Sequence, residues 1–285
     1  MENKTLVIAG MHRSGTSLVT QWLYRCGLFI GDELEGAAIG NMEGHFEDRD
    51  FLQLHQQLLQ KQGKPETGLI TSALPALNAA ALQEMEKLVA KRNNDHKEWG
   101  WKDPRTCLFL QAYSGLLTGA HYCIVVRDFN STISSLVTRE FKMQEKRFLT
   151  KKGLSKLKWI LFKRKSLEKI VTTKTDQLLK VWINYYEHLL LLINALPENK
   201  YMLINYISLA VNDKAVFDQL KLHWQFTLEY FPFHKVYHPE LISEVIDVKK
   251  YIKDKRLQKT AENIERLVHA KIMQHTKVVR MESFS

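Results

Sequence analysis

The sequence predicts a three-layer α/β domain in which a central, mostly parallel sheet is covered by helices on both faces. Short apolar runs with the character of buried strands alternate with longer segments of helical periodicity, as in chains that build a parallel sheet. The 285 residues are 45% apolar and 25% charged, which is ordinary for a folded chain that buries its own core. Because no repeat, low-complexity tract or linker divides the sequence, we expect a single domain over residues 1–285.

The first expected unit is a strand, a glycine-bounded loop and a helix. The apolar run 5–9 predicts the strand, and the loop that follows occupies residues 10–17. Beyond the loop, apolar side chains recur at helical spacing until Gly27, a residue type that commonly ends helices.

The rest of the chain continues this alternation. In order, we expect helices at about 50–61 and 75–92, a strand at 99–102 ended by the turn Asp103-Pro104, a strand at 121–127, a helix from about 130, a helix at about 175–196, a strand at 201–206, a helix at about 213–223 and a helical tail at 254–274 within the region 240–285. In such a sheet, ligands bind at the edge formed by the carboxyl ends of the strands.

The loop at 10–17 has the spacing of a P-loop but lacks its lysine. Gly10 and Gly15 are separated by four residues, and Thr16 and Ser17 follow. In a P-loop, backbone N–H groups and the helix N-terminus hold phosphate, while a lysine after the second glycine reaches the β- and γ-phosphates. Here Thr16 stands at the lysine position, and a cation appears earlier, as Arg13. The loop keeps an anion cradle without the lysine that a nucleoside triphosphatase requires.

Gly10-Met-His-Arg-Ser-Gly-Thr-Ser17 resembles the 5′-phosphosulfate loop of sulfotransferases that use 3′-phosphoadenosine 5′-phosphosulfate (PAPS). Its Arg-Ser-Gly-Thr core is similar to that of the tyrosylprotein, carbohydrate and many bacterial branches. The resemblance implies a P-loop-NTPase-like fold without a metal. It also implies a set of donor-binding residues in the loop: Gly10, His12, Arg13, Ser14, Gly15, Thr16 and Ser17.

A second motif, Arg127 followed eight residues later by Ser135, resembles the 3′-phosphate site of the same family. An arginine at a strand end is a bidentate phosphate ligand, and the serine adds a hydroxyl from the following helix. By itself Arg127 could equally form a surface ion pair with Asp128. A weaker similarity places Tyr206 at the tyrosine that the family uses beside adenine, although Ile207 replaces the acid that often follows that tyrosine.

The segment Trp101-Lys-Asp-Pro-Arg105 is similar to a Lys-Asp-Pro segment of the same branch. We expect Arg13 and Lys102 to stabilise the bridging oxygen of the donor as it leaves. The small-molecule branch of the family takes its catalytic histidine two residues after a lysine, and Pro104 stands at that position here.

A hydroxyl acceptor needs a base for its proton, and the resemblance implies an acid after the first helix. Glu47 is the first candidate, His45 the second and Glu43 the third. The alternative is that Glu47 and Asp48 only cap the helix that follows, where negative side chains are favoured.

The net charge of +10 is concentrated in residues 139–180, which hold 14 Lys and Arg against 4 acids. This segment predicts either a solvated, mobile helical hairpin or a surface for an anionic partner: an acidic glycan, an anionic lipid headgroup or a nucleic acid. In the second case it would form a flap that attracts an anionic acceptor and helps to cover the site. The apolar run 159–162 lies inside it, so peripheral membrane contact through 151–165 is one expectation. We expect no nucleic-acid partner.

These observations favour a sulfotransferase that moves the sulfuryl group from PAPS to a hydroxyl and leaves 3′-phosphoadenosine 5′-phosphate (PAP). By branch resemblance the acceptor is a carbohydrate or glycolipid. One rival is a phosphotransferase that uses ATP and Mg²⁺, with Asp103 or Asp128 as its acid. Another rival is a non-catalytic binder of polyanions or membrane surfaces.

The cysteines and the apolar runs bear on the cellular setting. Three scattered cysteines indicate neither a zinc site nor a disulfide framework. With no signal peptide or spanning segment readable, we expect a cytoplasmic protein, with the inner membrane face as the alternative location.

Overall fold

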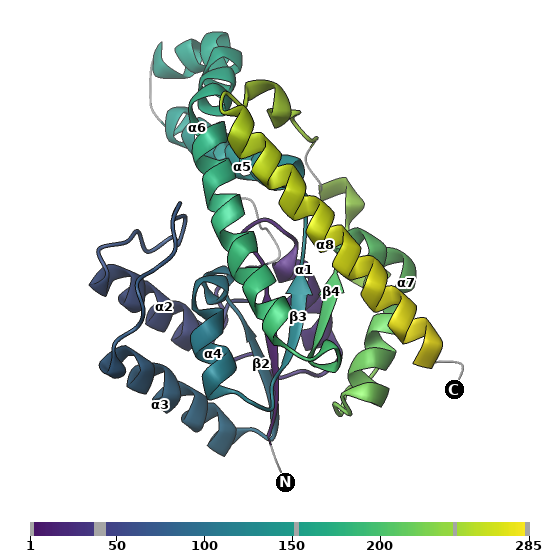
Figure 1. Cartoon of the computed structure of the whole chain (residues 1–285). Helices are drawn as coiled ribbons and strands as arrows, with labels where there is room; N and C mark the ends of the chain where they lie inside the picture. The colour runs from purple at the N-terminus through teal and green to yellow at the C-terminus, as the bar shows by residue number, and fades with distance from the viewer. Residues whose placement is uncertain (1–2, 37–43, 151–153, 242–243, 283–285) are drawn as a thin grey trace.

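The computed structural model describes residues 3–36, 44–150, 154–241 and 244–282 (Figure 1). Its centre is one sheet of four parallel strands in the order β2-β1-β3-β4. The strands are β1 (Lys4–Ala9), β2 (Glu98–Lys102), β3 (His121–Val125) and β4 (Tyr201–Ile204). The prediction of a three-layer α/β fold with a parallel sheet is confirmed.

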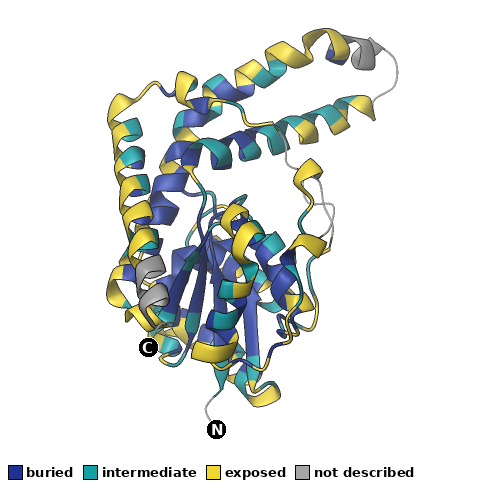
Figure 2. Cartoon of the chain, turned by 90° about the vertical axis from the view of Figure 1, so that its right-hand side faces the viewer, coloured by how far each residue is buried: buried dark blue, intermediate teal, exposed yellow. Residues whose placement is uncertain are grey.

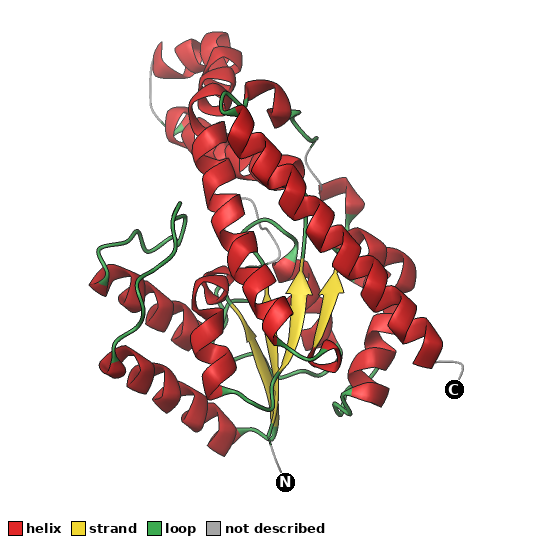
Figure 3. Cartoon of the chain, viewed as in Figure 1, coloured by secondary structure: helices red, strands yellow, loops and turns green. Residues whose placement is uncertain are grey.

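Helices cover both faces of the sheet (Figure 3). They are α1 (Thr16–Arg25), α2 (Arg49–Lys61), α3 (Ala79–Asp95), α4 (Leu110–Leu116), α5 (Phe129–Leu149), α6 (Leu154–Ala195), α7 (Tyr206–Asp218) and α8 (Lys255–Glu282). Alternate side chains of each strand enter opposite cores. Leu6 and Ile8 pack with α1 and α7, whereas Val7 and Ala9 pack in the larger core that the other helices share.

The strand register brings four chain segments to one edge of the sheet. Ile8 of β1 pairs with Lys102 of β2 and with Cys123 of β3. The glycine loop therefore leaves β1 beside the end of β2, and Arg127 and Tyr206 each follow two residues after the end of their strands. Every segment that carried a sequence motif thus ends at the same edge.

Two helices begin well before the residue that the periodicity predicted. Helix α6 begins at Leu154 instead of about residue 175 and runs for 42 residues, because Trp159 in its lysine-rich start packs on α5. Its ring stacks on Phe148 at 4.9 Å and lies 5.4 Å from Phe141. Helix α7 begins at Tyr206 instead of 213, with a non-helical residue at Asn212 and a π-helical turn at Gln219–His223.

The segment before α2 is held by a buried arginine. Arg92, 1% exposed, donates to Asp48 at 3.0 Å, to Asp50 at 2.8 Å and to Asp32 at 2.7 Å. Asp48 also caps α2 by accepting from Asp50 N. Since a buried guanidinium needs several acceptors, these contacts fix the backbone on either side of residue 48.

In the part of the chain that the structure describes, no helix has the length and apolar character required to cross a membrane.

Candidate anion-binding and transfer site

The loop between β1 and α1 is folded around two residues in the left-handed region. Arg13 has φ 69° and Gly15 has φ 101°, and between them the Ser14 hydroxyl donates to Met11 O at 2.8 Å. A Cβ on Gly10 would stand 2.6 Å from Val125 O, so only glycine fits there. Backbone that alternates in this way turns successive N–H groups inward at a helix N-terminus, which makes an anion-binding cradle.

The two motifs separated by more than 100 residues are joined by hydrogen bonds. Arg13 Nε donates to Ser135 Oγ at 2.9 Å, and Arg127 donates to the carbonyl oxygen of Arg13 at 2.9 Å. The Arg127 guanidinium lies 5.5 Å from the centroid of the Tyr206 ring. That ring packs on Gly15, where a Cβ would come within 2.6 Å of it. The sequence-predicted residues Arg13, Gly15, Arg127, Ser135 and Tyr206 form one cluster.

The backbone of Arg127 is held from α6. Arg127 N donates to the Tyr186 hydroxyl at 2.7 Å, and that hydroxyl donates to Arg127 O at 2.5 Å. Asp128, the residue that could have paired with Arg127 at the surface, instead accepts from Ser131 N and caps α5. Tyr186 was not anticipated, since no local pattern relates it to a residue 59 positions away.

Positive charge is concentrated around the loop. Burial, together with the neighbouring guanidiniums of Arg139 and Arg127, lowers the pKa of Arg13 to about 10. Arg139 was not singled out as a site residue, although it lies one helical turn after Ser135 on the same face of α5. Three guanidiniums that repel one another are stabilised when an anion binds between them.

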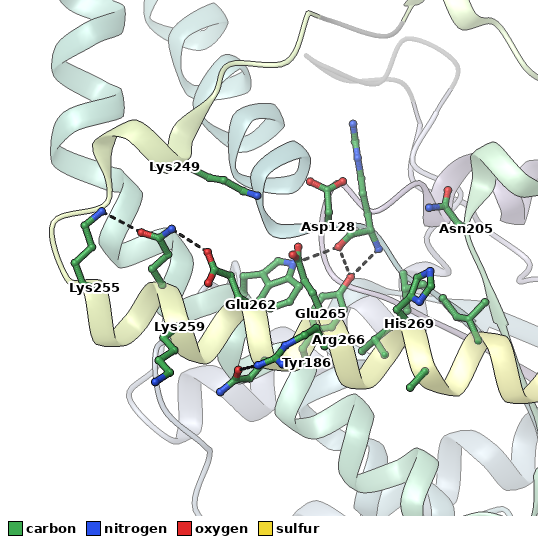
Figure 4. A pocket seen from close by; sticks show the side chains of 18 residues that line it. Asp128, Tyr186, Asn205, Lys249, Lys255, Lys259, Glu262, Glu265, Arg266 and His269 are labelled. Carbon is green, nitrogen blue, oxygen red and sulfur yellow. Dashed lines mark hydrogen bonds between the residues drawn. The ribbon is translucent and has the colours of Figure 1, made fainter.

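A groove of about 1100 Å³ adjoins this cluster (Figure 4). It opens between α8 and the carboxyl ends of β3 and β4, where Arg127 and Asn205 line it. From α8 and the turn before it, basic side chains line the opposite side: Lys249, Lys255, Lys259 and Arg266. The volume is at the upper end of the range of small-molecule sites.

The second half of the site surrounds Lys102, which is fully buried. Its Nζ donates to Glu47 Oε1 at 3.0 Å and to Ser17 Oγ at 3.2 Å. Arg105 lies 3.8 Å from Glu47 Oε2, and His45 Nδ1 lies 4.0 Å from Glu47 Oε1. Burial lowers the pKa of Lys102, and Glu47 opposes that shift. Two cations, one carboxylate and one imidazole therefore meet beside the loop.

The three candidate bases have different positions. Glu47 is not the helix cap, because Asp48 takes that role; its side chain pairs with Lys102. His45 is held beside it, and burial lowers the pKa of the imidazole, which is therefore neutral at pH 7. Glu43 lies outside the described residues.

Asp103 anchors the end of β2. Its oxygens contact His55 Nδ1 at 2.6 Å and Arg105 at 2.7 Å, and His55 Nε2 contacts the Tyr113 hydroxyl at 2.8 Å. Burial alone would raise the pKa of Asp103, but the hydrogen bond from His55 and the charge of Arg105 hold it below its ordinary value. The carboxylate thus positions Arg105, which the sequence motif contained without indicating a role for it.

Three other predicted loop residues make structural contacts. His12 Nε2 donates to Thr67 O at 2.9 Å, and burial together with Arg105 lowers its pKa to about 3. Ser14 is used within the loop turn, and the carbonyl of Thr16 accepts from Thr20. The side chains of His12 and Ser14 therefore hold the loop in shape, and the Ser14 N–H also donates within the turn, to Met11 O at 3.2 Å.

No family model and no curated protein matches the chain. Among solved structures, it is similar to the sulfotransferase domain of the Synechococcus PCC 7002 olefin synthase, with 15% identity over 93% of this chain and 95% of that one and a TM-score of 0.48. The sulfotransferase domain of the curacin biosynthetic pathway gives 13% identity over 93% and 98%, with a TM-score of 0.49.

A third similar structure is the sulfotransferase STF1 of Mycobacterium tuberculosis H37Rv, with 12% identity over 92% of this chain and 77% of that one and a TM-score of 0.47. Identities and TM-scores this low leave the function to be inferred from the site itself.

Replacing Glu47 by Gln should lower the free energy of unfolding at pH 7 by about 3 kcal/mol, because it leaves the buried Lys102 ammonium without its carboxylate. The loss should shrink between pH 7 and 10. Without Glu47 the folded-state pKa of Lys102 falls further below its unfolded value, so the unfolded chain binds more protons and stability rises with pH. Denaturant titrations across this range measure the effect.

The matched control is Glu84→Gln, which removes the exposed partner of Lys61 and should cost under about 1 kcal/mol with no such pH dependence. A deficit for Glu47→Gln that stays constant from pH 7 to 10 would show that Lys102 does not respond to Glu47.

Proposed function

We propose that this chain transfers the sulfuryl group of PAPS to a hydroxyl group of an acceptor, without a metal, and releases PAP. The observation that carries the proposal is the hydrogen-bonded link between the loop and the second motif, from Arg13 to Ser135 and from Arg127 to Arg13 O, each 2.9 Å long. A ligand that bridges the two needs anionic groups at two places, as in a nucleotide with a 5′-phosphosulfate and a 3′-phosphate.

Each part of the cluster has a role in holding this donor. The loop N–H groups and Arg13 would bind the phosphosulfate, since a cradle at a helix N-terminus favours anions. Arg127 and Ser135 would bind the 3′-phosphate, and Tyr206, whose ring packs on the loop, would lie beside the base. The guanidiniums of Arg139 and Arg127, which together with burial lower the pKa of Arg13, support a ligand with several negative charges.

The position of Lys102 favours this donor over ATP with Mg²⁺. In a P-loop, the hydroxyl two residues after the second glycine holds Mg²⁺. Ser17 occupies that place, and its hydroxyl accepts from the Lys102 ammonium. The two strand-end acids suggested for a metal have other partners. Asp103 contacts His55 and Arg105, and Asp128 caps α5. A fixed ammonium thus stands where the triphosphatase reaction needs a divalent cation.

The transfer step uses the other half of the site. The acceptor oxygen forms a bond to sulfur as the bond from sulfur to the 5′-phosphate oxygen breaks, and the acceptor proton passes to Glu47. Lys102 and Arg13 would stabilise the charge that develops on the departing oxygen. Because the sulfuryl group is transferred without a covalent enzyme intermediate, positioning and cationic stabilisation supply the rate.

The acceptor and the cellular setting are part of the proposal. The Arg-Ser-Gly-Thr core of the loop supports a carbohydrate or glycolipid hydroxyl, as in the branch that it resembles. A reducing, cytoplasmic setting is supported by Cys26, Cys107 and Cys123, which are buried free thiols.

Thermal unfolding with three ligands tests the proposal. PAP at 100 times its Kd should raise the Tm by roughly 5 °C, because binding to the folded state adds about 2.7 kcal/mol. ATP with Mg²⁺ should have a much smaller effect, and heparin should not substitute for PAP. Stabilisation by ATP only when Mg²⁺ is present, with none by PAP, would contradict the proposal and favour a phosphotransferase.

Arg127→Ala should weaken binding of PAPS about 10- to 100-fold, since a charge-assisted phosphate contact is worth about 1.5–3 kcal/mol. Binding of adenosine 5′-phosphosulfate, which lacks the 3′-phosphate, should change much less. Isothermal titration with both nucleotides measures the difference, and Arg25→Ala, an exposed arginine at the opposite end of α1, is the matched control. Equal losses for the two nucleotides would show that Arg127 does not contact the 3′-phosphate.

Glu47→Gln should keep the affinity for PAP while transfer falls about 100-fold or more, the usual scale for a lost general base. His45→Gln should have a smaller effect, because His45 would act only by positioning Glu47, from which its Nδ1 lies 4.0 Å away. Single-turnover transfer from labelled PAPS measures both variants. Normal turnover in Glu47→Gln together with a large loss in His45→Gln would assign the base to His45.

A further inference from the structure

The end of the α5–α6 hairpin exposes apolar side chains. Figure 2 shows the hairpin projecting from the domain, with exposed residues along its outer part. In the first described turns of α6, Ile160, Leu161 and Phe162 are 54%, 68% and 54% exposed. Leu149, at the end of α5, is 46% exposed. Contiguous apolar exposure of this kind marks a surface that contacts a partner or a membrane.

The packing of the hairpin keeps these side chains outward. Trp159, 4% exposed, takes the inner position against α5, where its ring stacks on Phe148 and its Nε1 donates to Glu145 at 3.2 Å. With Trp159 inside, Ile160 and Leu161 lie on other sides of the helix, and Phe162, one turn on from Trp159, is still 54% exposed. Their exposure is therefore set by the fold.

Positive charge surrounds the apolar residues. The described residues 142–150 and 159–165 contain six Lys and Arg and one acid, Glu145, whose carboxylate accepts from Trp159. Lys163, Arg164 and Lys165 are exposed immediately after the apolar residues, and Lys165 lies 5.9 Å from the centroid of the Phe162 ring. Long cationic side chains beside apolar ones suit the boundary between acyl chains and headgroups.

We propose that the end of this hairpin, the described residues 142–150 and 159–165, docks on the surface of a bilayer that contains anionic lipids. Ile160, Leu161 and Phe162 enter the headgroup boundary, and the surrounding lysines and arginines bind the acidic headgroups. A second copy of the chain is disfavoured because two such basic ends repel each other. A nucleic acid would match the charge and leave the aliphatic side chains in water.

The hairpin projects from the edge of the sheet that carries the site (Figure 1). Helix α5 contributes Ser135 and Arg139 to the site and continues to Leu149, about 15 Å further along its axis. Docking through its end would turn the carboxyl edge of the sheet toward the bilayer. The inference stands apart from the proposed function; if both hold, the acceptor is a hydroxyl presented at a membrane surface.

Sedimentation of the full chain with lipid vesicles tests the inference. The chain should bind vesicles of equal parts phosphatidylcholine and phosphatidylglycerol and should not bind phosphatidylcholine alone. The triple variant Lys163→Gln, Arg164→Gln, Lys165→Gln should bind about 100-fold more weakly, because each cation near an anionic surface contributes about 5-fold. Ile160→Ser, Leu161→Ser and Phe162→Ser together should lower it by at least as much.

The matched control is Val211→Ser with Leu222→Ser, which removes exposed apolar residues, 86% and 65% exposed, from another part of the molecule. This variant should bind vesicles like the unaltered chain. All variants should have the same Tm and the same affinity for PAP as the unaltered chain. Equal binding to neutral vesicles, no binding to either vesicle, or unchanged binding in the apolar variant would overturn the inference. Retention on heparin without vesicle binding would assign the surface to a soluble polyanion instead.

A second measurement does not depend on the folding of the triple variants, because it uses single cysteine substitutions at exposed positions. Because Cys26, Cys107 and Cys123 are all buried, Leu161→Cys creates an accessible thiol that can carry an environment-sensitive fluorophore. Its emission should shift to the blue when anionic vesicles are added, and the same label at Val211→Cys should not respond. Emission at position 161 that is unaltered by anionic vesicles would contradict insertion.

Discussion

The parallel register of the four strands is the constraint on which the rest of this molecule depends. Because Ile8 of β1 lies opposite both Lys102 and Cys123, the carboxyl ends of the strands share one edge. The glycine loop leaves the sheet there and contacts Lys102 through Ser17, Arg127 through Arg13 O and the Tyr206 ring through Gly15. A shift of one strand by two residues would keep its apolar pattern and separate these groups, so the site depends on register more than on any single side chain.

The two halves of the site differ in how their charge is balanced. Around the loop, Arg13 lies near Arg127 and Arg139, and burial, with the repulsion between these guanidiniums, lowers the pKa of Arg13. Around Lys102, Glu47 offsets the ammonium inside a fully buried environment. An anionic ligand would stabilise the arginines around the loop, whereas the charge of Lys102 is already balanced by Glu47. This division suits a site that binds an anionic donor beside a preformed group for proton transfer.

Helix α5 connects the site with the proposed docking surface. Its start is fixed by Tyr186, which bonds the backbone of Arg127 just before the helix, and by Glu265, which accepts from Phe129 N at 2.8 Å. Its second turn carries Ser135 to Arg13, and its last turns pair with the start of α6 around Trp159. One rigid helix therefore relates the position of the loop to the surface that would contact lipid.

The sequence by itself determined the layered fold, because apolar strands and a glycine loop are local patterns whose physical cause acts within a few residues. Arg127 and Ser135 were expected from the family resemblance, and the structure brings both beside Arg13. The tertiary structure decided the rest. It placed the cap on Asp48 and left Glu47 to pair with Lys102. It brought Arg105 and Arg139 to the site, and it started α6 at Leu154 by burying Trp159. These outcomes depend on contacts with other elements and on burial, neither of which leaves a periodic signal in the residues concerned.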